Sequence, residues 1–200
     1  MSKLETNTID TISGSTNLTL GGTNATDITI PAGVTITNNG TQSGFGGTNT
    51  PNFGAKATSN QTGITSGAWT KIQFDTAIFN VGSGYDTVND KFVVPSGEAG
   101  KYYFTASAKI NSSGGGNTLI GSGIRFTVNG SASAGLEEIH FMANGSQNSE
   151  GKNCNGILNL SVADEIEVYA YYQDNGGGAG TITGVTSEID TFFFGYKLVE

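Results

Sequence analysis

The chain of 200 residues contains little of what most catalytic and metal centres need. It has one cysteine, Cys154, and one histidine, His140. A lone cysteine forms no internal disulfide, and zinc sites use several Cys or His ligands at close spacing, so we expect neither feature. Any nucleophilic triad would depend on His140, to which we assign a structural or surface role on a strand. Cys154, in the polar sequence NCNG, is expected to be an incidental thiol near the start of a strand.

Positive charge is also scarce. The chain has nine Lys and Arg residues against seventeen Asp and Glu, which gives a net charge of −8, and Arg125 is the single arginine. Phosphate backbones are bound by clustered Lys and Arg, so we exclude nucleic acid as a partner, and the same scatter disfavours an anionic membrane surface. The apolar runs are too short to span a bilayer, and we see no signal peptide. We therefore expect no membrane insertion, and synthesis and folding in a cytoplasm.

Gly, Asn, Ser and Thr dominate the chain, whereas Leu is scarce and only 13% of residues are charged. The abundant residues are weaker helix formers than Ala, Leu, Glu or Lys, so the composition favours an all-β fold. The clearest alternation covers residues 100–110, with Tyr102 and Phe104 on one face and Tyr103 on the other. Further strands are expected at 53–57, 69–74, 120–128, 136–142, 157–162, 166–172 and 191–198.

We expect about eight such strands to form two antiparallel sheets around an aromatic core. The expected core residues are Trp69, Phe74, Phe92, Tyr102, Phe104, Ile124, Phe126, Ile139, Phe141, Leu158, Leu160, Ile166, Val168, Phe192 and Phe194. Burial of each large side chain contributes roughly 1.5–3 kcal/mol, so such a sandwich is stable without disulfides.

A glycine-punctuated run of anchor residues, mostly aromatic, extends from Phe74 to Phe104. The anchors are Phe74, Phe79, Asn80, Tyr85, Phe92, Gly100, Tyr102 and Phe104. This pattern resembles the signature of the C1q/TNF-like jelly-roll family, a β-sandwich that normally works as a trimer. Two extra residues separate Phe92 from Gly100, and Ala106 occupies the final aromatic position. Residues 191–198 resemble the closing strand of the family. The resemblance covers residues 53–200 and implies the fold and a homotrimer, but says little about activity.

The first part of the chain differs in character from the rest. In its segments 26–30 and 34–37, polar and apolar residues alternate, and a turn signal at 31–33 separates the two segments. Strands this short cannot offset their ordering entropy alone, so they must pair with copies of themselves or with another protein. We divide the chain into an N-terminal anchoring arm (1–37), a flexible linker (38–52) and a jelly-roll head (53–200). The expected anchoring residues of the arm are Leu4, Ile9, Ile12, Leu18, Leu20, Ile28 and Ile30.

Acidic residues cluster at 137–138 and 164–167. Paired carboxylates can hydrolyse glycosidic bonds, but Glu137 and Glu138 point to opposite faces of a strand. Tyr is favoured at interfaces, and a stripe of Glu and Tyr side chains shares one strand face. The residues expected at the trimer interface are Tyr103, Glu165, Glu167, Tyr169 and Tyr171.

Two loops contain oxygen ligands of the kind that calcium prefers. They are residues 86–90, in the sequence YDTVNDK, and the pair Asp174 and Asn175. Neither matches a helix–loop–helix calcium motif, so we interpret both as solvated turns. We expect no metal and no cofactor.

Residues 3–10 (KLETNTID) and 13–31 (SGSTNLTLGGTNATDITIP) also resemble N-terminal segments of structural proteins from tailed bacteriophages. Together these features favour a non-enzymatic virion protein, a trimeric capsid decoration or fibre protein that its arm anchors to capsid or tail components. Two alternatives stay open. One is a tail fibre or tail-tip protein that recognises a host surface glycan or protein, and the other is a stand-alone C1q-like lectin.

Overall fold

The computed structural model describes residues 32–33, 49–142, 147–187 and 189–198, and for residues 133–135 it describes the backbone only. The chain divides into two compact units, Met1–Phe45 and Gly46–Glu200. The expected anchoring residues of the arm lie outside the described residues. Residues 32–33 form a turn in which Gly33 has φ 84°, consistent with the turn signal in the sequence.

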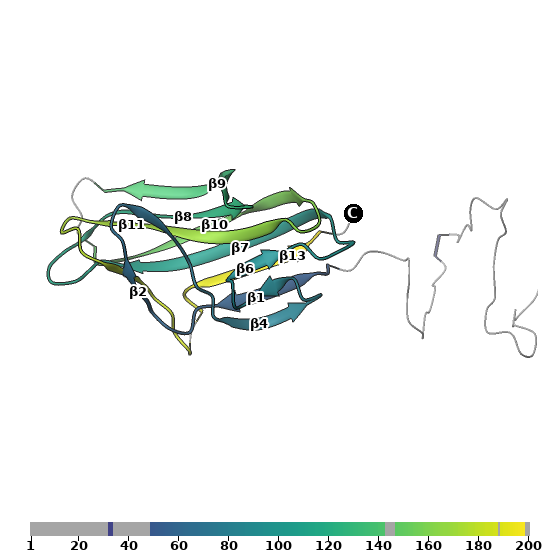
Figure 1. The fold of residues 1–200 in the computed structure, drawn as a ribbon, viewed down its shortest axis with the longest axis horizontal. Helices are drawn as coiled ribbons and strands as arrows, with labels where there is room; N and C mark the ends of the chain where they lie inside the picture. Colours follow the sequence, from purple (N-terminus) through teal and green to yellow (C-terminus); the bar gives the residue numbers. More distant parts are fainter. Residues whose placement is uncertain (1–31, 34–48, 143–146, 188, 199–200) are drawn as a thin grey trace, which may run out of the picture. The chain divides into compact units, whose positions relative to one another are not determined.

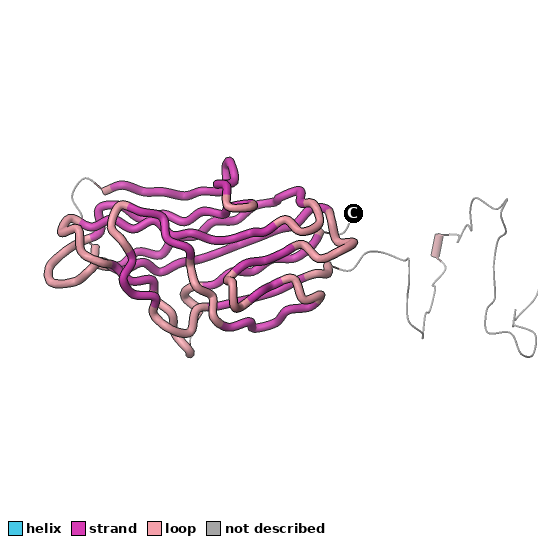
Figure 2. The backbone as a smooth tube through the Cα atoms, in the orientation of Figure 1, coloured by secondary structure: helices cyan, strands magenta, loops and turns pink. Residues whose placement is uncertain are grey.

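The described part of the second unit is built from β-strands, and the described residues include no helix (Figures 1 and 2). The strands are β1 (Asn52–Lys56), β2 (Gln61–Ile64), β3 (Ala68–Lys71), β4 (Thr76–Val81), β5 (Tyr85–Asp86), β6 (Lys91–Val93), β7 (Gly100–Asn111), β8 (Leu119–Val128), β9 (Ser131–Phe141), β10 (Ser149–Leu160), β11 (Glu165–Asp174), β12 (Gly180–Ile182) and β13 (Phe192–Lys197).

These strands form two antiparallel sheets. Sheet A has seven strands, six of which follow the order β2–β12–β7–β13–β1–β4. β12 and β13 pair with different residues of β7, and the seventh strand, β10, pairs with β7 along its whole length. Sheet B has six strands in the order β5–β6–β11–β8–β9, and β3 also pairs with β11. The two sheets enclose an aromatic core and form the sandwich that the strand pattern and the family resemblance predict.

Alternation along β7 and β11 supplies much of that core. Every second residue of β7 from Tyr102 to Ile110 is fully buried, in agreement with the predicted face. Phe53 of β1 lies at the centre, with ring centroids 5.0 Å from Phe92 and 4.8 Å from Phe193. Burial of aromatic side chains of this size dominates the stability of such a core.

Two expected core residues of β9 are exposed, which corrects the prediction. Ile139 is 37% exposed and Phe141 is 59% exposed. The register with β8 pairs Gly121 with Phe141 and the buried Ser122 with His140. His140 therefore lies on the inner face of β9 and Phe141 on the outer face, the reverse of the prediction. The apolar contribution of this part of the chain comes instead from Leu136, on the same face as His140, and from Met142 just after the strand, which both pack against the core.

Three further core assignments were wrong. Trp69, Phe192 and Phe194 are only partly buried, whereas Phe193 is fully buried. Three consecutive phenylalanines do not show which of them point inward. Pairing of Phe193 with the inward-facing Ala106 fixes the face, so its two neighbours lie on the outer surface of sheet A.

Cys154 was also misplaced. It lies in the middle of β10, which begins at Ser149 rather than near residue 157, and it is buried. The first half of β10 is polar and contains glycine, so it lacks a strand pattern. It forms nevertheless, because all twelve residues of β10 pair with β7.

Candidate functional site

The outer face of sheet A carries two groups of partly exposed aromatic side chains, Phe79, Phe194 and Phe192 in one and Tyr103 and Tyr196 in the other. Phe79 of β4 is 45% exposed and Tyr196 of β13 is 37% exposed. Phe194 stacks against Phe79 at 6.2 Å and against Phe192 at 4.8 Å. Ile157 of β10, at 59% exposure, extends the apolar surface beside Tyr103. We call this surface the aromatic face of sheet A.

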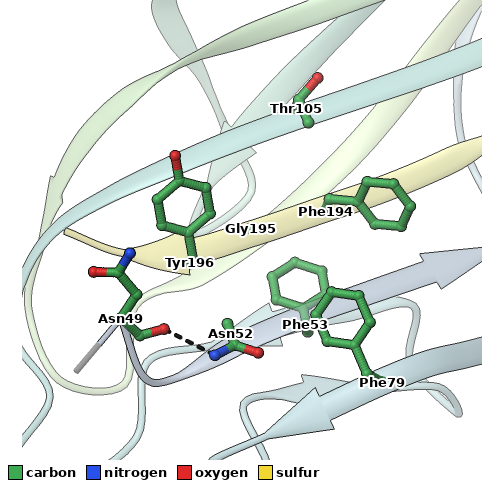
Figure 3. Close-up of a pocket in the computed structure, with 8 residues that line it drawn as sticks. All are labelled: Asn49, Asn52, Phe53, Phe79, Thr105, Phe194, Gly195 and Tyr196. Carbon is green, nitrogen blue, oxygen red and sulfur yellow. Dashed lines mark hydrogen bonds between the residues drawn. The ribbon is translucent and has the colours of Figure 1, made fainter.

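The aromatic face contains a hollow of about 420 Å³ (Figure 3). The residues that line it are Asn49, Asn52, Phe53, Phe79, Thr105, Phe194, Gly195 and Tyr196. They come from β1, β4, β7 and β13 and from the segment before β1. None of the eight is charged, and the Asn52 side chain donates a hydrogen bond to the Asn49 carbonyl at 2.9 Å. The hollow thus has aromatic walls and an amide rim.

Gly54 allows the aromatic rings to meet over β1. A Cβ at this position would lie 2.7 Å from ring atoms of both Phe79 and Phe194. Any larger residue would push the two rings apart. The close packing of aromatic side chains on the outside of sheet A therefore depends on a glycine in the strand beneath them.

Of the residues expected at the trimer interface, only Tyr103 lies on sheet A. Its ring centroid is 5.5 Å from that of Tyr196, so it borders the aromatic face. The other four lie on β11, on the outer face of sheet B. The structure therefore does not bring the five predicted residues together.

The four β11 side chains have partners within the chain. Glu165 pairs with Lys91 at 2.6 Å and Glu167 with Lys71 at 2.5 Å. The Tyr169 hydroxyl donates to Glu167 at 3.1 Å, and burial together with this carboxylate raises the pKa of Tyr169. The two lysines thus neutralise both carboxylates of the stripe within the chain.

Tyr171 belongs to an aromatic cluster on the same face. Its ring lies 5.5 Å from Trp69 and 5.7 Å from Phe141. The Arg125 guanidinium lies over Trp69 at 4.2 Å, a cation–π contact, and its Nη1 is 3.6 Å from Glu137. These contacts explain why Trp69 and Phe141 lie outside the core.

His140 and Cys154 are not arranged for nucleophilic catalysis in the part of the chain that the structure describes. His140 Nδ1 lies 3.5 Å from Glu150, whereas the Ser122 hydroxyl donates to Glu150 rather than to the imidazole. Burial and the charge of Glu138 raise the pKa of the Cys154 thiol to about 11, which opposes thiolate formation.

The loop at 86–90 is stabilised by its own side chains. Asp86 accepts backbone hydrogen bonds from Val88 at 2.9 Å and from Asn89 at 3.1 Å, and hydrogen bonds from Asn89 lower its pKa. Asp90 accepts from the Phe74 backbone at 2.9 Å. Among the described residues, no group of three or more His, Cys, Asp or Glu side chains is placed to hold a metal ion. That part of the chain also contains no helix that is both long and apolar enough to cross a membrane.

Comparison with known proteins defines the fold. No protein-family model matches the chain, and none of the curated proteins matches it in sequence. Among solved structures, the globular domain of zebrafish complement 1qA protein aligns with a TM-score of 0.50 and 13% identity, covering 74% of this chain and 97% of that chain. Murine APRIL at pH 5.0 aligns with a TM-score of 0.53 and 15% identity, covering 74% and 98%. The head is thus a C1q/TNF-like jelly roll, as the signature from Phe74 to Phe104 predicted.

Sequence reasoning did not find the aromatic face of sheet A. Phe79 was interpreted as a family anchor, and Phe192 and Phe194 as core residues. The available signal was the run Phe192–Phe194, because three consecutive large apolar residues in one strand must place at least one on the outer surface.

Proposed function

We propose that this protein is a non-enzymatic structural protein of a tailed-bacteriophage virion. The head would assemble as a homotrimer, and the arm (1–37) would anchor it to capsid or tail components after synthesis in the host cytoplasm. The observation that carries the proposal is the aromatic face of sheet A, because a large exposed apolar patch marks an interaction surface. A second copy of the chain is the partner that we assign to it. The phage context is supported by residues 3–10 and 13–31 alone.

Several features support self-association through this face. Aromatic residues are enriched at the buried centres of interfaces, and charged residues are depleted there. The hollow combines three exposed or partly exposed rings with no charged lining residue. The structural neighbours are a complement globular domain and a TNF-family protein, and the family signature implies a trimer.

The mass of the full chain in solution tests the trimer. We expect about three monomer masses by light scattering for the wild type. Phe79→Ser should shift this mass to that of a monomer and leave the circular dichroism spectrum unchanged, because Phe79 is 45% exposed. Tyr171→Ser on sheet B is the matched control and should stay trimeric. A trimer that survives Phe79→Ser but dissociates in Tyr171→Ser would place the interface at the β11 stripe. A monomeric wild type would contradict a trimer interface at either surface.

Co-purification tests the virion assignment. The full chain should be found in gradient-purified phage particles. A variant lacking residues 1–37 should remain trimeric but fail to bind particles stripped of the native protein. Binding that does not need the arm, or absence from the particles, would contradict the anchoring role.

One observation favours a second candidate, a receptor-binding head of a tail fibre or a free-standing lectin. The amide side chains of Asn49 and Asn52 lie beside exposed aromatic rings in the hollow, and sugars are commonly bound by stacking and hydrogen bonding of this kind. This candidate predicts that the wild type binds to a glycan array. Phe79→Ser should abolish this binding without changing the mass of the protein in solution. The two candidates therefore differ in which measurement Phe79→Ser changes.

A further inference from the structure

A cluster of polar side chains closes the gap between the edges of the two sheets. β9 is the last strand of sheet B and β10 is the edge strand of sheet A beside β7. The two strands contact each other, and no backbone pairing joins them within the described residues. Glu138 and His140 project from the inner face of β9, and Glu150 and Lys152 from the inner face of β10.

Lys152 is the centre of this cluster. Its side chain is only 5% exposed, and its ammonium lies 2.8 Å from Glu150 and 3.3 Å from Glu138. Glu150 also accepts a hydrogen bond from Ser122 and lies 3.5 Å from His140. The ammonium therefore has one carboxylate on its own strand and one across the gap.

A buried ammonium is stable only while it is paired. When one partner of a buried ion pair is removed, the remaining charge is left without compensation in a poorly solvated site, which is strongly destabilising. Glu150, the nearer of the two carboxylates, can lose its charge through protonation. This end of the contact between β9 and β10 thus depends on a group that titrates, whereas Leu136 of β9 packs over Gly156 of β10 at the other end.

We propose that Glu138, His140, Glu150 and Lys152 form an acid-sensitive latch that holds β9 against β10 at neutral pH and releases it in acid. The groups that face Lys152 are Glu138 and His140 from β9, Glu150 and Cys154 from β10, and the uncharged hydroxyl of Ser122 from β8. Glu137, on the outer face of β9, pairs with Arg125 and does not face the cluster. The latch is independent of the phage assignment.

The direction of the pH dependence follows from Glu150. Burial alone would raise its pKa, but hydrogen bonds from Lys152 and Ser122 outweigh burial and hold the pKa below the usual value. A carboxylate with a lowered pKa stabilises the folded contact above its ordinary pKa, and this contribution is lost as the pH falls through the lowered value. Once Glu150 is protonated, the Lys152 ammonium has lost its nearest carboxylate in a poorly solvated site, which favours opening of the latch.

Cys154 provides a reporter, because it is buried next to Lys152 on the same inner face. The probe is 4,4′-dithiodipyridine, which reacts with thiols in acid, used with the full chain at low protein concentration because the isoelectric point is about 4.5. The rate for Cys154 relative to that of free cysteine should rise about tenfold between pH 7 and pH 3, while circular dichroism shows an intact fold. Glu165→Gln, which neutralises an exposed carboxylate paired with Lys91, should give the same profile.

The variant Glu138→Gln/Glu150→Gln/Lys152→Met removes the ion pairs and should give a relative rate that does not rise in acid. Hydrogen exchange of the wild type keeps the test decisive if this variant fails to fold. Corrected for intrinsic rates, the β9 amides should lose protection at pH 3 while those of β7 keep it. Retained protection of β9 at pH 3, loss from β9 and β7 together, or an acid-dependent rate in the triple variant would overturn the latch.

Discussion

Asp174 shows how one side chain ties two glycine-rich loops together. It is 4% exposed and accepts hydrogen bonds from the Ser113 hydroxyl at 2.6 Å and the Tyr172 hydroxyl at 2.5 Å. Burial would raise its pKa, but these hydrogen bonds lower it to about 2. Glycine runs at 114–116 and 176–178 mark both loops in the sequence, but they give no sign of the bonds between them, because Ser113 and Asp174 are far apart along the chain.

Asp174→Asn should destabilise the head by about 1–3 kcal/mol at pH 7, because the variant loses charge-assisted hydrogen bonds in a buried site. The contribution of Asp174 is present above its ordinary pKa and is lost as the pH falls towards 2. The difference between variant and wild type should therefore shrink between pH 4 and pH 2 in urea denaturation. Glu137→Gln, at an exposed position on β9, is the control and should show no such convergence.

Phe104 tests the core at the level of one residue. It is fully buried and lies between the rings of Phe92 and Phe193. Phe104→Ala should lower the free energy of unfolding by about 3–5 kcal/mol, because it leaves a cavity among packed rings. Val88→Ala, at a side chain that is 86% exposed, should change it by less than about 0.5 kcal/mol. Equal unfolding midpoints for the two variants would contradict the placement of Phe104.

At the scale of the strand, alternation predicted β7 correctly but gave the wrong face for β9. β7 is paired along both edges and packed on one face, so its apolar residues had to share that face. β9 is an edge strand, and its inner face carries Glu138, whose counter-charge is Lys152, and His140, which lies 3.5 Å from Glu150. Both partners lie on β10 in the other sheet, and the local sequence of β9 contains no sign of them.

The phenylalanine run of β13 gives a direct test of strand register. Phe193→Ala should cost about 3–5 kcal/mol of unfolding free energy, because Phe193 is fully buried among aromatic rings. Phe192→Ala should cost clearly less in the monomeric state, since its ring lies on the outer surface and packs mainly on Phe194. Chemical denaturation of the two variants in the Phe79→Ser background separates folding from association. A larger loss for Phe192→Ala would reverse the assigned register.

For the whole molecule, the fold could be predicted more completely than the aromatic face of sheet A. The anchors from Phe74 to Phe104 are largely buried core positions, and the core requirement fixes their spacing. The aromatic face of sheet A carries no such spacing. Phe79, Phe194, Tyr196 and Ile157 come from three separate strands, so only their pairing in sheet A brings them to one surface.

The head should fold without the first unit of the chain. The described core is formed entirely by residues between Phe53 and Phe193, within the unit Gly46–Glu200. A fragment of residues 46–200 should therefore unfold cooperatively, with a melting temperature within a few degrees of that of the full chain under conditions that keep both monomeric. Calorimetry of both proteins measures this, and a fragment with no thermal transition would place essential contacts in residues 1–45.

The composition of β4 has a practical consequence for handling the protein. This edge strand has no Lys, Glu or Pro, and Ile78, Phe79 and Val81 are all about half exposed. Without such residues on the strand itself, only the repulsion between negatively charged molecules opposes edge-to-edge aggregation, and that repulsion vanishes near the isoelectric point of about 4.5. Purification should therefore give its best yield in alkaline, low-salt buffer, and Ile78→Lys would supply a gatekeeper that keeps concentrated samples clear.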